Sequence, residues 1–149
     1  MPTAHRIPAQ RKPPQPGART LGILAAGPAQ IAALIHAGLP FHRLARYQKA
    51  TALPWEKIAR IIAIPLRTLS RRQKEGRLTP EESDRLWRAA TLFDLALDLF
   101  EGDLPAARRW LQQPQPALGN ASPLDFASTD IGAREVENLI GRLEHGIFS

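Results

Sequence analysis

The fold of this chain is decided by residues 55–72, which read WEKIARIIAIPLRTLSRR. Apolar residues recur at helical spacing through the first half, and Leu66 and Leu69 continue the pattern in the second. Pro65 stands between the halves, where a proline suits the first position of a helix because its missing N–H would have no partner there. Gly76 suits the end of the second helix. The stretch therefore predicts two short helices that meet at a tight joint and turn both leucines inward.

The second of these helices leaves basic side chains on its free face. With the leucines inward, Arg67, Thr68 and Arg71 point outward. A helix-turn-helix places the N-terminal half of such a helix against base edges in the DNA major groove. There arginine bonds guanine O6 and N7, and threonine offers a hydroxyl or a methyl contact. Further cations along the pair are expected to contact phosphate: Arg72, Lys74, Lys57, Arg60 and Arg77. The alternative is an ordinary helical hairpin with solvated arginines.

The charge of the chain is unevenly distributed along its 149 residues, with a net charge of +6. Residues 1–79 hold 14 lysines and arginines against two acids, a net charge of +12. Residues 80–149 hold six arginines against 12 acids, a net charge of −6. The first part therefore suits a polyanion and the second would be repelled by one. This distribution favours the DNA-binding interpretation, although a solvated basic face would show the same charges.

The patterns along the chain predict an all-α protein in three parts. Residues 1–20 are rich in proline and basic residues, which predicts a disordered basic arm. Residues 21–79 are expected to form a helix-turn-helix DNA-binding domain, and residues 80–149 a small helical domain for dimerisation and partner binding. Prolines before and glycines after the apolar periods predict helices near 28–37, 40–51, 55–62, 65–76, 80–101, 105–112, a single turn from 123, and 130–145.

The longest predicted helix, residues 80–101, is apolar on two sides. Such a helix is either central in the fold or lies at a subunit interface. Together with the two-fold symmetry of many operators, this suggests a homodimer. The acids Asp94, Asp98 and Glu101 fall on one side of the helix, which predicts a solvated edge.

The residue types argue against a catalytic or metal site. The chain has no cysteine, and no two of its four histidines stand at the spacing that zinc peptidases use. It shows no glycine-rich phosphate loop and no nucleophile elbow. We therefore expect no catalytic residue, no metal and no cofactor. No run of about 20 apolar residues is present, so no membrane span is expected. The lack of cysteine is compatible with a cytoplasmic location.

Two stretches of the chain resemble one known family when they are taken together. Leu66–Leu78, followed by Glu82–Leu86, resembles the middle of Xre-type antitoxins. The downstream region resembles the toxin-binding domain of the Xre/MbcA/ParS antitoxin group through Ala107, Trp110-Leu111, Pro116–Gly119, Ser122–Asp125, Thr129, Gly132, Val136 and Leu139–Ile147. The order and spacing of these pieces are specific, and the resemblance covers about residues 30–149.

The resemblance implies a type II toxin–antitoxin system of the RES–Xre kind. In that family the antitoxin binds its operator, represses its own transcription and holds the toxin inactive. The RES-domain toxin is implied to be an NAD-degrading enzyme, whereas the antitoxin has no catalytic role. The expected partners are therefore a RES-domain toxin, operator DNA and a second copy of the chain.

The resemblance also implies where the toxin binds. The C-terminal helix should lie against the toxin, with the end of the chain near the toxin's active-site entrance. The residues concerned are Arg142, His145, Gly146, Ile147 and Phe148. An arginine that offers a fork of donors suits a pocket for pyrophosphate, and Phe148 suits an apolar slot. The alternative is that Leu143, Ile147 and Phe148 only cover the core. The remaining matched residues are expected to be structural: Trp110, Leu111, Thr129, Gly132, Val136 and Leu139.

Two other functions remain open at this point. The chain could be a stand-alone transcriptional regulator whose C-terminal part only dimerises. It could also be a toxin inhibitor whose vestigial helix-turn-helix no longer reads DNA.

Overall fold

The computed structural model describes residues 14–24 and 27–146, and over these residues the protein is helical without strands. The elements in chain order are α1 (Ala18–Leu21), α2 (Pro28–Ala37), α3 (Phe41–Thr51), α4 (Trp55–Ile61), α5 (Leu66–Glu75), α6 (Pro80–Leu99), α7 (Leu104–Gln112), the 3-10 turn η1 (Pro116–Leu118), α8 (Pro123–Phe126) and α9 (Asp130–Glu144). A single isolated antiparallel bridge joins Pro40 to Arg77 within the described ranges. The predicted all-α class is confirmed, and α1 and η1 are the elements that the sequence patterns did not predict.

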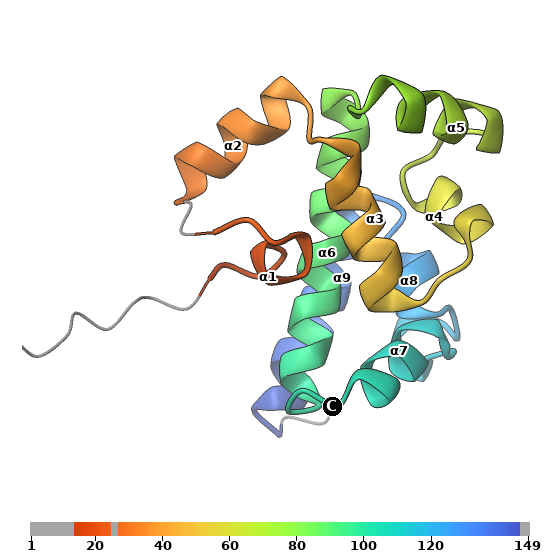
Figure 1. Ribbon diagram of the computed structural model, residues 1–149. Helices are drawn as coiled ribbons and strands as arrows, with labels where there is room; N and C mark the ends of the chain where they lie inside the picture. The colour runs from red at the N-terminus through yellow and green to blue at the C-terminus, as the bar shows by residue number, and fades with distance from the viewer. Residues whose placement is uncertain (1–13, 25–26, 147–149) are drawn as a thin grey trace, which may run out of the picture.

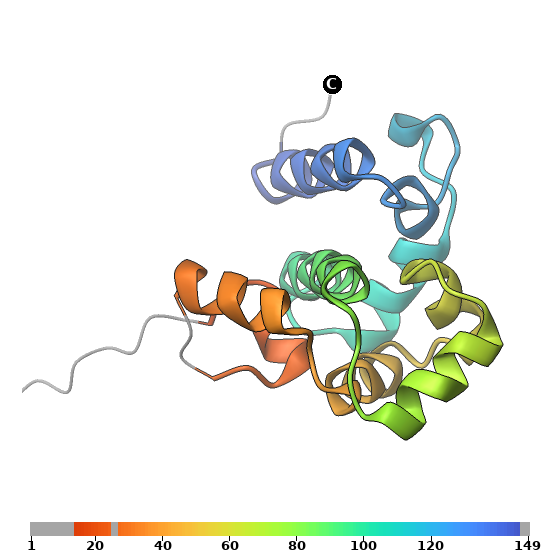
Figure 2. The same ribbon diagram turned by 90° about the horizontal axis from the view of Figure 1, so that it is seen from above.

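Helix α6 is the centre of the fold. It runs through the middle of the molecule in Figure 1, and it contacts α1, α2, α3 and α4 as well as α7 and α9. Figure 2, which looks nearly along α6, shows α9 on one side of it and α3 and α5 on the other. The two apolar sides of α6 are therefore both covered within one chain. Of the two predicted explanations the central position is the right one, so the apolar pattern of α6 no longer supports a homodimer.

The buried side chains form two clusters that share α6. The larger runs from Ala18 to Leu111 and includes Tyr47, Leu86 and Phe93. The smaller joins Leu92 of α6 to η1 and α9, through Leu118, Ala133, Val136, Leu139 and Ile140. The predicted division at residue 79/80 therefore passes through the larger cluster, and α6 belongs to both halves.

The N-terminal segment before residue 21 is ordered where the structure describes it. Ala18 and Leu21 are buried in the larger cluster, and α1 packs against α3 and α6. The prediction of a disordered arm is therefore wrong for residues 14–20, while residues 1–13 lie outside the described part. Arg43 also attaches this segment to α3, because its Nη1 donates to the carbonyl oxygens of Leu21 and Gly22 at 2.9 Å each.

Asp94 explains why this segment folds back. Its side chain is fully buried and accepts hydrogen bonds from the backbone N–H of Gly17 at 2.6 Å, the backbone N–H of Thr20 at 3.3 Å and the Thr20 hydroxyl. The predicted solvated edge is therefore wrong for Asp94. Asp98 remains near the surface and pairs with Arg19 at 2.7 Å. Spacing within α6 could not distinguish the two acids, because the donors come from more than 70 residues away.

Replacing Asp94 should reveal how much this anchor contributes. Asp94→Ala leaves buried donors of Gly17 and Thr20 without an acceptor, so we expect a loss of about 2–4 kcal/mol in the free energy of unfolding. Urea denaturation of the full chain measures it. The matched control is Asp98→Ala, which breaks a surface pair worth at most about 1 kcal/mol. Equal losses in the two variants would contradict the anchoring role of Asp94.

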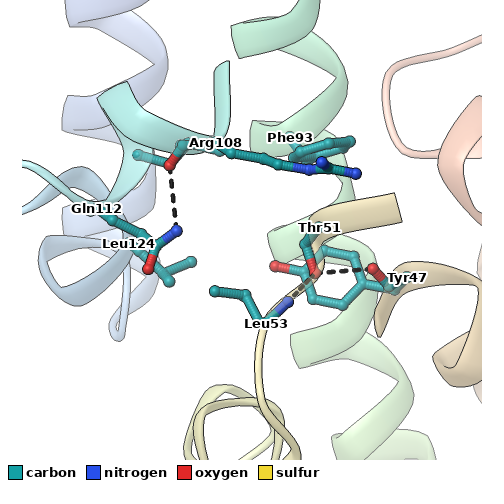
Figure 3. A pocket seen from close by; sticks show the side chains of 8 residues that line it. Tyr47, Thr51, Leu53, Phe93, Arg108, Gln112 and Leu124 are labelled. Carbon is teal, nitrogen blue, oxygen red and sulfur yellow. Dashed lines mark hydrogen bonds between the residues drawn. The ribbon is translucent and has the colours of Figure 1, made fainter. Parts of the chain in front are cut away.

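Helix α7 ties the C-terminal region to the first half of the chain. Arg108 donates to the carbonyl oxygen of Ala50 from Nε at 3.0 Å and from Nη2 at 2.7 Å. This carbonyl lies in the last turn of α3, where backbone oxygens lack helical partners. Figure 3 shows Arg108 extending toward Phe93 above Thr51. The cavity enclosed there is only about 10 Å³, room for about one water molecule. A more open cleft of about 540 Å³, also lined by Ala50, Phe93 and Arg108, lies beside it.

Candidate functional site

Helices α4 and α5 form the predicted pair. They are joined by residues 62–65, in which Ala63 has a φ of 59° and turns the chain sharply. Ile58, Ile62 and Leu69 are buried between the helices and the larger cluster. Pro65 precedes α5 as its N-cap rather than forming its first residue. The order of elements, helix, tight turn and second helix, is that of a helix-turn-helix.

The exposed face of α5 carries one row of polar and basic side chains. Arg67, Ser70, Arg71 and Lys74 stand at i, i+3, i+4 and i+7, and all four are exposed. We call these four residues the recognition row. Thr68, which the sequence placed beside Arg67 and Arg71, is half-buried at its edge. The sequence interpretation missed Ser70, although its spacing from Arg67 would have found it.

The charges of the recognition row are largely free of internal partners. Within the described ranges, neither Arg67 nor Lys74 has an acidic side chain at ion-pair distance, while Arg71 pairs with Glu75 at 3.6 Å. Both members of that pair are more than half or about half exposed, and such surface pairs contribute little. The arginines are therefore available to an anionic ligand.

Arg72 lies on the other side of α5 and has a different environment. Its side chain is 14% exposed, and its Nε and Nη2 donate to the two carboxylate oxygens of Glu82 at 2.8 and 3.0 Å. Glu75 accepts a further bond from Nη1 at 3.2 Å. This fork-to-fork pair fastens α5 to the start of α6. This placement suits a structural role for Arg72 and does not suit the predicted phosphate contact. The pairing could not be predicted from helical spacing, because Glu82 lies ten residues further along the chain.

The same contacts displace two pKa values. The hydrogen bond to Glu82 raises the pKa of Arg72 above its ordinary value. Burial is the strongest influence on Glu82 and raises the pKa of its carboxyl group, but Arg72 and the backbone N–H of Thr79 together lower it more. The pKa of Glu82 therefore lies below its ordinary value. Thr79 completes the predicted capping box by accepting from the Glu82 N–H at 3.2 Å.

This shift predicts a pH dependence of stability. Because the pKa of Glu82 is lower in the folded than in the unfolded protein, its contribution is complete above an unfolded pKa of about 4.3 and disappears as the pH falls through the folded value. Glu82→Gln should be less stable at neutral pH, and its stability should fall less steeply than that of the natural protein below about pH 5. Urea denaturation across this range, with the exposed Glu75→Gln as control, measures the difference. Parallel curves for Glu82→Gln and the natural protein would contradict the assignment.

The other predicted phosphate contacts lie beside the recognition row rather than on it. Lys57 and Arg60 of α4 line a cleft of about 270 Å³ between α4, α6 and α8, together with Arg85. Lys57 also donates to Gln112 at 3.2 Å. Arg77 follows α5 and donates to the carbonyl oxygen of Gly38. The structure thus groups Arg67, Ser70, Arg71 and Lys74, and leaves these three cations on neighbouring elements.

Helix α9 is held against α6 by its inner face. Thr129 caps the helix by accepting from the Gly132 N–H at 3.0 Å. A Cβ on Gly132 would lie 1.8 Å from the Phe126 carbonyl oxygen, so only glycine allows α8 and α9 to approach this closely. Val136 and Leu139 are buried. The structural roles predicted for Trp110, Leu111, Thr129, Gly132, Val136 and Leu139 are confirmed by packing or capping.

The outer face of α9 points away from the fold. We call it the outer α9 row and define it as Ile131, Arg134, Glu135, Asn138, Arg142 and His145. Ile131 is 77% exposed, and the sequence interpretation missed it because this residue lies off the apolar stripe that identifies the helix. Arg142 is half-buried, whereas His145 and Gly146 are exposed. Leu143 packs against the smaller cluster, as the covering alternative predicts for that residue. Ile147 and Phe148 lie outside the described residues.

No group of three or more histidine, cysteine or acidic side chains among the described residues is arranged to hold a metal ion. None of the described helices combines the length and the apolar character needed to cross a membrane.

Two family models match consecutive parts of the chain. Residues 30–90 match the family model of the antitoxin Xre-like helix-turn-helix domain. Residues 95–146 match that of the antitoxin Xre/MbcA/ParS C-terminal toxin-binding domain. The first match contains α4 and α5, the second contains α9, and the boundary between them falls inside α6.

Similar curated proteins carry the same description. The chain is 48% identical over 99 residues to an "Antitoxin Xre" of Yersinia enterocolitica, covering 66% of this chain and 67% of the relative. It is 37% identical over 132 residues to an "Antitoxin Xre" of Photorhabdus laumondii, covering 88% of this chain and 89% of the relative. With helix-turn-helix and toxin-binding domains in this order, the chain belongs to the Xre antitoxin family.

Proposed function

We propose that this protein neutralises a RES-domain, NAD-degrading toxin through its C-terminal region and represses its own operon by binding operator DNA through α5. The observation that carries the proposal is the position of the two surfaces. The recognition row and the outer α9 row lie on different sides of α6, as Figure 2 shows for the helices that carry them. One molecule has room to bind DNA and a second protein at once.

The DNA-binding half of the proposal rests on charge and geometry. Arg67 projects from the N-terminal half of α5, where a helix-turn-helix meets base edges, and Arg71 lies one turn further along the same exposed face. Lys74 stands further along the row and suits a phosphate. We assign the neighbouring Lys57, Arg60 and Arg77 to phosphate contacts as well, and Arg72 to the attachment of α5 to α6. The exposed arginines and lysine on α5 favour operator binding over a vestigial helix-turn-helix that no longer reads DNA.

The toxin-binding half rests on the C-terminal end of the chain. Residues 95–146 match a toxin-binding domain. Arg142 is half-buried in the last turn of α9, and His145 and Gly146, which follow the helix, are exposed. We propose that these residues contact the toxin together with Ile147 and Phe148. The RES identity of the toxin and the operator are inferred from the sequence resemblance. A homodimer is proposed from the two-fold symmetry of operators.

The direct test combines the two activities. The chain is co-expressed with the protein encoded by the adjacent gene, and DNA upstream of the operon is footprinted with the purified chain. We expect growth to be restored, the two proteins to co-purify and a defined upstream segment to be protected. A toxic neighbour that stays toxic would contradict the neutralising role. Upstream DNA bound no more tightly than unrelated DNA would contradict the repressor role.

A further inference from the structure

Leu66 is an exposed apolar side chain of α5, the helix that carries the recognition row. It is the first residue of α5 and is 47% exposed, although the sequence pattern predicted that it would face inward with Leu69. Leu69 is buried as expected. Leu66 stands at the start of α5, three positions before the buried Leu69. The other large apolar side chains that are exposed in the described ranges lie on other elements: Leu24, Leu34, Trp55, Leu104 and Ile131.

The position of Leu66, rather than its exposure alone, indicates a role. Single exposed leucines are ordinary on protein surfaces. Leu66, however, lies at the end of α5 that a helix-turn-helix directs toward base edges. It adjoins Arg67 and precedes Ser70 by about one helical turn. A ligand that Arg67 contacts from this end of α5 would therefore lie close to Leu66 as well.

The chemistry of the major groove identifies what a leucine can recognise there. Base edges present hydrogen-bond donors, hydrogen-bond acceptors and one apolar group, the C5 methyl of thymine. Leucine has no hydrogen-bonding group, so it contributes favourably only by packing against that methyl. Its neighbours Arg67 and Arg71 carry the donors that suit guanine.

We propose that Leu66 packs against the C5 methyl of a thymine in each operator half-site and thereby helps to determine DNA specificity. The thymine lies next to the base pair that Arg67 or Arg71 contacts. This inference rests on the proposed operator binding. It adds a base preference that neither charge nor the family matches assign.

Deoxyuridine substitution tests the contact, because it removes only the methyl group and preserves base pairing. The probe is the footprinted DNA upstream of the operon, with each thymine replaced in turn, and the protein is the full chain. Burial of one methyl group is worth about 0.8 kcal/mol, so the Kd should rise about three- to fivefold at one thymine in each half-site. For Leu66→Ala, substitution at that thymine should have no effect, while the remaining thymines should behave as with the natural protein.

Two further variants complete the experiment. Leu104→Ala removes a similarly exposed leucine from α7 and should keep the natural deoxyuridine pattern. Leu66→Gln introduces a side chain that is one atom longer and carries an amide, and it should shift the preference at that position toward adenine, which glutamine binds through N6 and N7. If circular dichroism shows that Leu66→Ala is poorly folded, Leu66→Gln takes its place in the test.

Several outcomes would overturn the inference. One is natural protein that is insensitive to every deoxyuridine, and another is a sensitive thymine that stays sensitive with Leu66→Ala. A third is a Leu66→Ala protein that loses toxin binding and keeps its DNA preference, which would place Leu66 at the toxin. If the natural protein does not prefer the upstream DNA at all, the proposed repressor function fails as well, so the two failures are distinguishable.

Discussion

Deleting residues 142–149 should release the toxin encoded with this protein while leaving operator binding almost unchanged. The deletion removes the half-buried Arg142 from the last turn of α9, and the exposed His145 and Gly146 with the residues that follow them. It keeps Val136, Leu139 and Ile140, which hold α9 against α6. Loss of a central group of interface residues costs about 2–4 kcal/mol or more, so toxin affinity should fall by at least about 30-fold. Growth on co-expression and calorimetry with purified toxin measure the two effects.

The deletion also removes the half-buried Leu143, so point variants are needed beside it. Arg142→Ala and His145→Ala in the full chain should each weaken toxin binding without lowering the melting temperature appreciably. Arg109→Ala changes an exposed arginine on α7, away from α9, and should bind toxin normally. If the deleted chain is folded and still silences the toxin, residues 142–149 are not the inhibitory segment.

Replacing Arg67 and Arg71 together by alanine should abolish specific operator binding. Each arginine that holds a guanine through two hydrogen bonds contributes about 1–3 kcal/mol of discrimination, so the pair should cost about a hundredfold or more in affinity. The proper control removes the same charge elsewhere. Arg109→Ala with Arg134→Ala changes two exposed arginines on α7 and α9 and should leave specific binding nearly intact. Titrations with the footprinted DNA at one fixed salt concentration compare the two proteins.

Salt dependence distinguishes base contacts from phosphate contacts in the same series. Lys74→Ala should reduce the log–log salt slope by about 0.9 if the lysine holds one phosphate. Replacing Arg67 and Arg71 together by alanine should lower the affinity for operator DNA but change the log–log salt slope less for each charge removed. If the Arg67/Arg71 double variant and the Arg109/Arg134 control lose equal affinity for operator DNA, binding depends only on net charge. That result would contradict a specific role for α5.

The helices of this protein could be predicted because their boundaries are local. Pro28 opens α2 and Gly76 ends α5 where the sequence indicates, since both residues act through their own backbone. The recognition row could be found for the same reason, because helical spacing alone sets which side chains share a face. These features need no knowledge of distant parts of the chain.

The predictions that proved wrong concern the burial of side chains whose partners lie far along the chain, or that stand at the first position of a helix. Asp94 is buried because α1 folds back on it, and α1 is too short to show a period. Arg72 differs from Arg71 only through Glu82 on the next helix. Leu66 matches the inner stripe in spacing but, at the first position of α5, remains 47% exposed. Such differences depend on tertiary contacts, which a single sequence does not display.

Hydroxyl-radical footprinting of side chains tests the central claim, that DNA and toxin bind different sides of α6. The chain is oxidised alone, with the upstream DNA and with the purified toxin. We expect DNA to protect Leu66 and Arg67 and to leave Ile131 and His145 reactive. Toxin should protect Ile131 and His145 and leave Leu66 reactive. Protection of the recognition row by the toxin, or of the outer α9 row by DNA, would contradict the account.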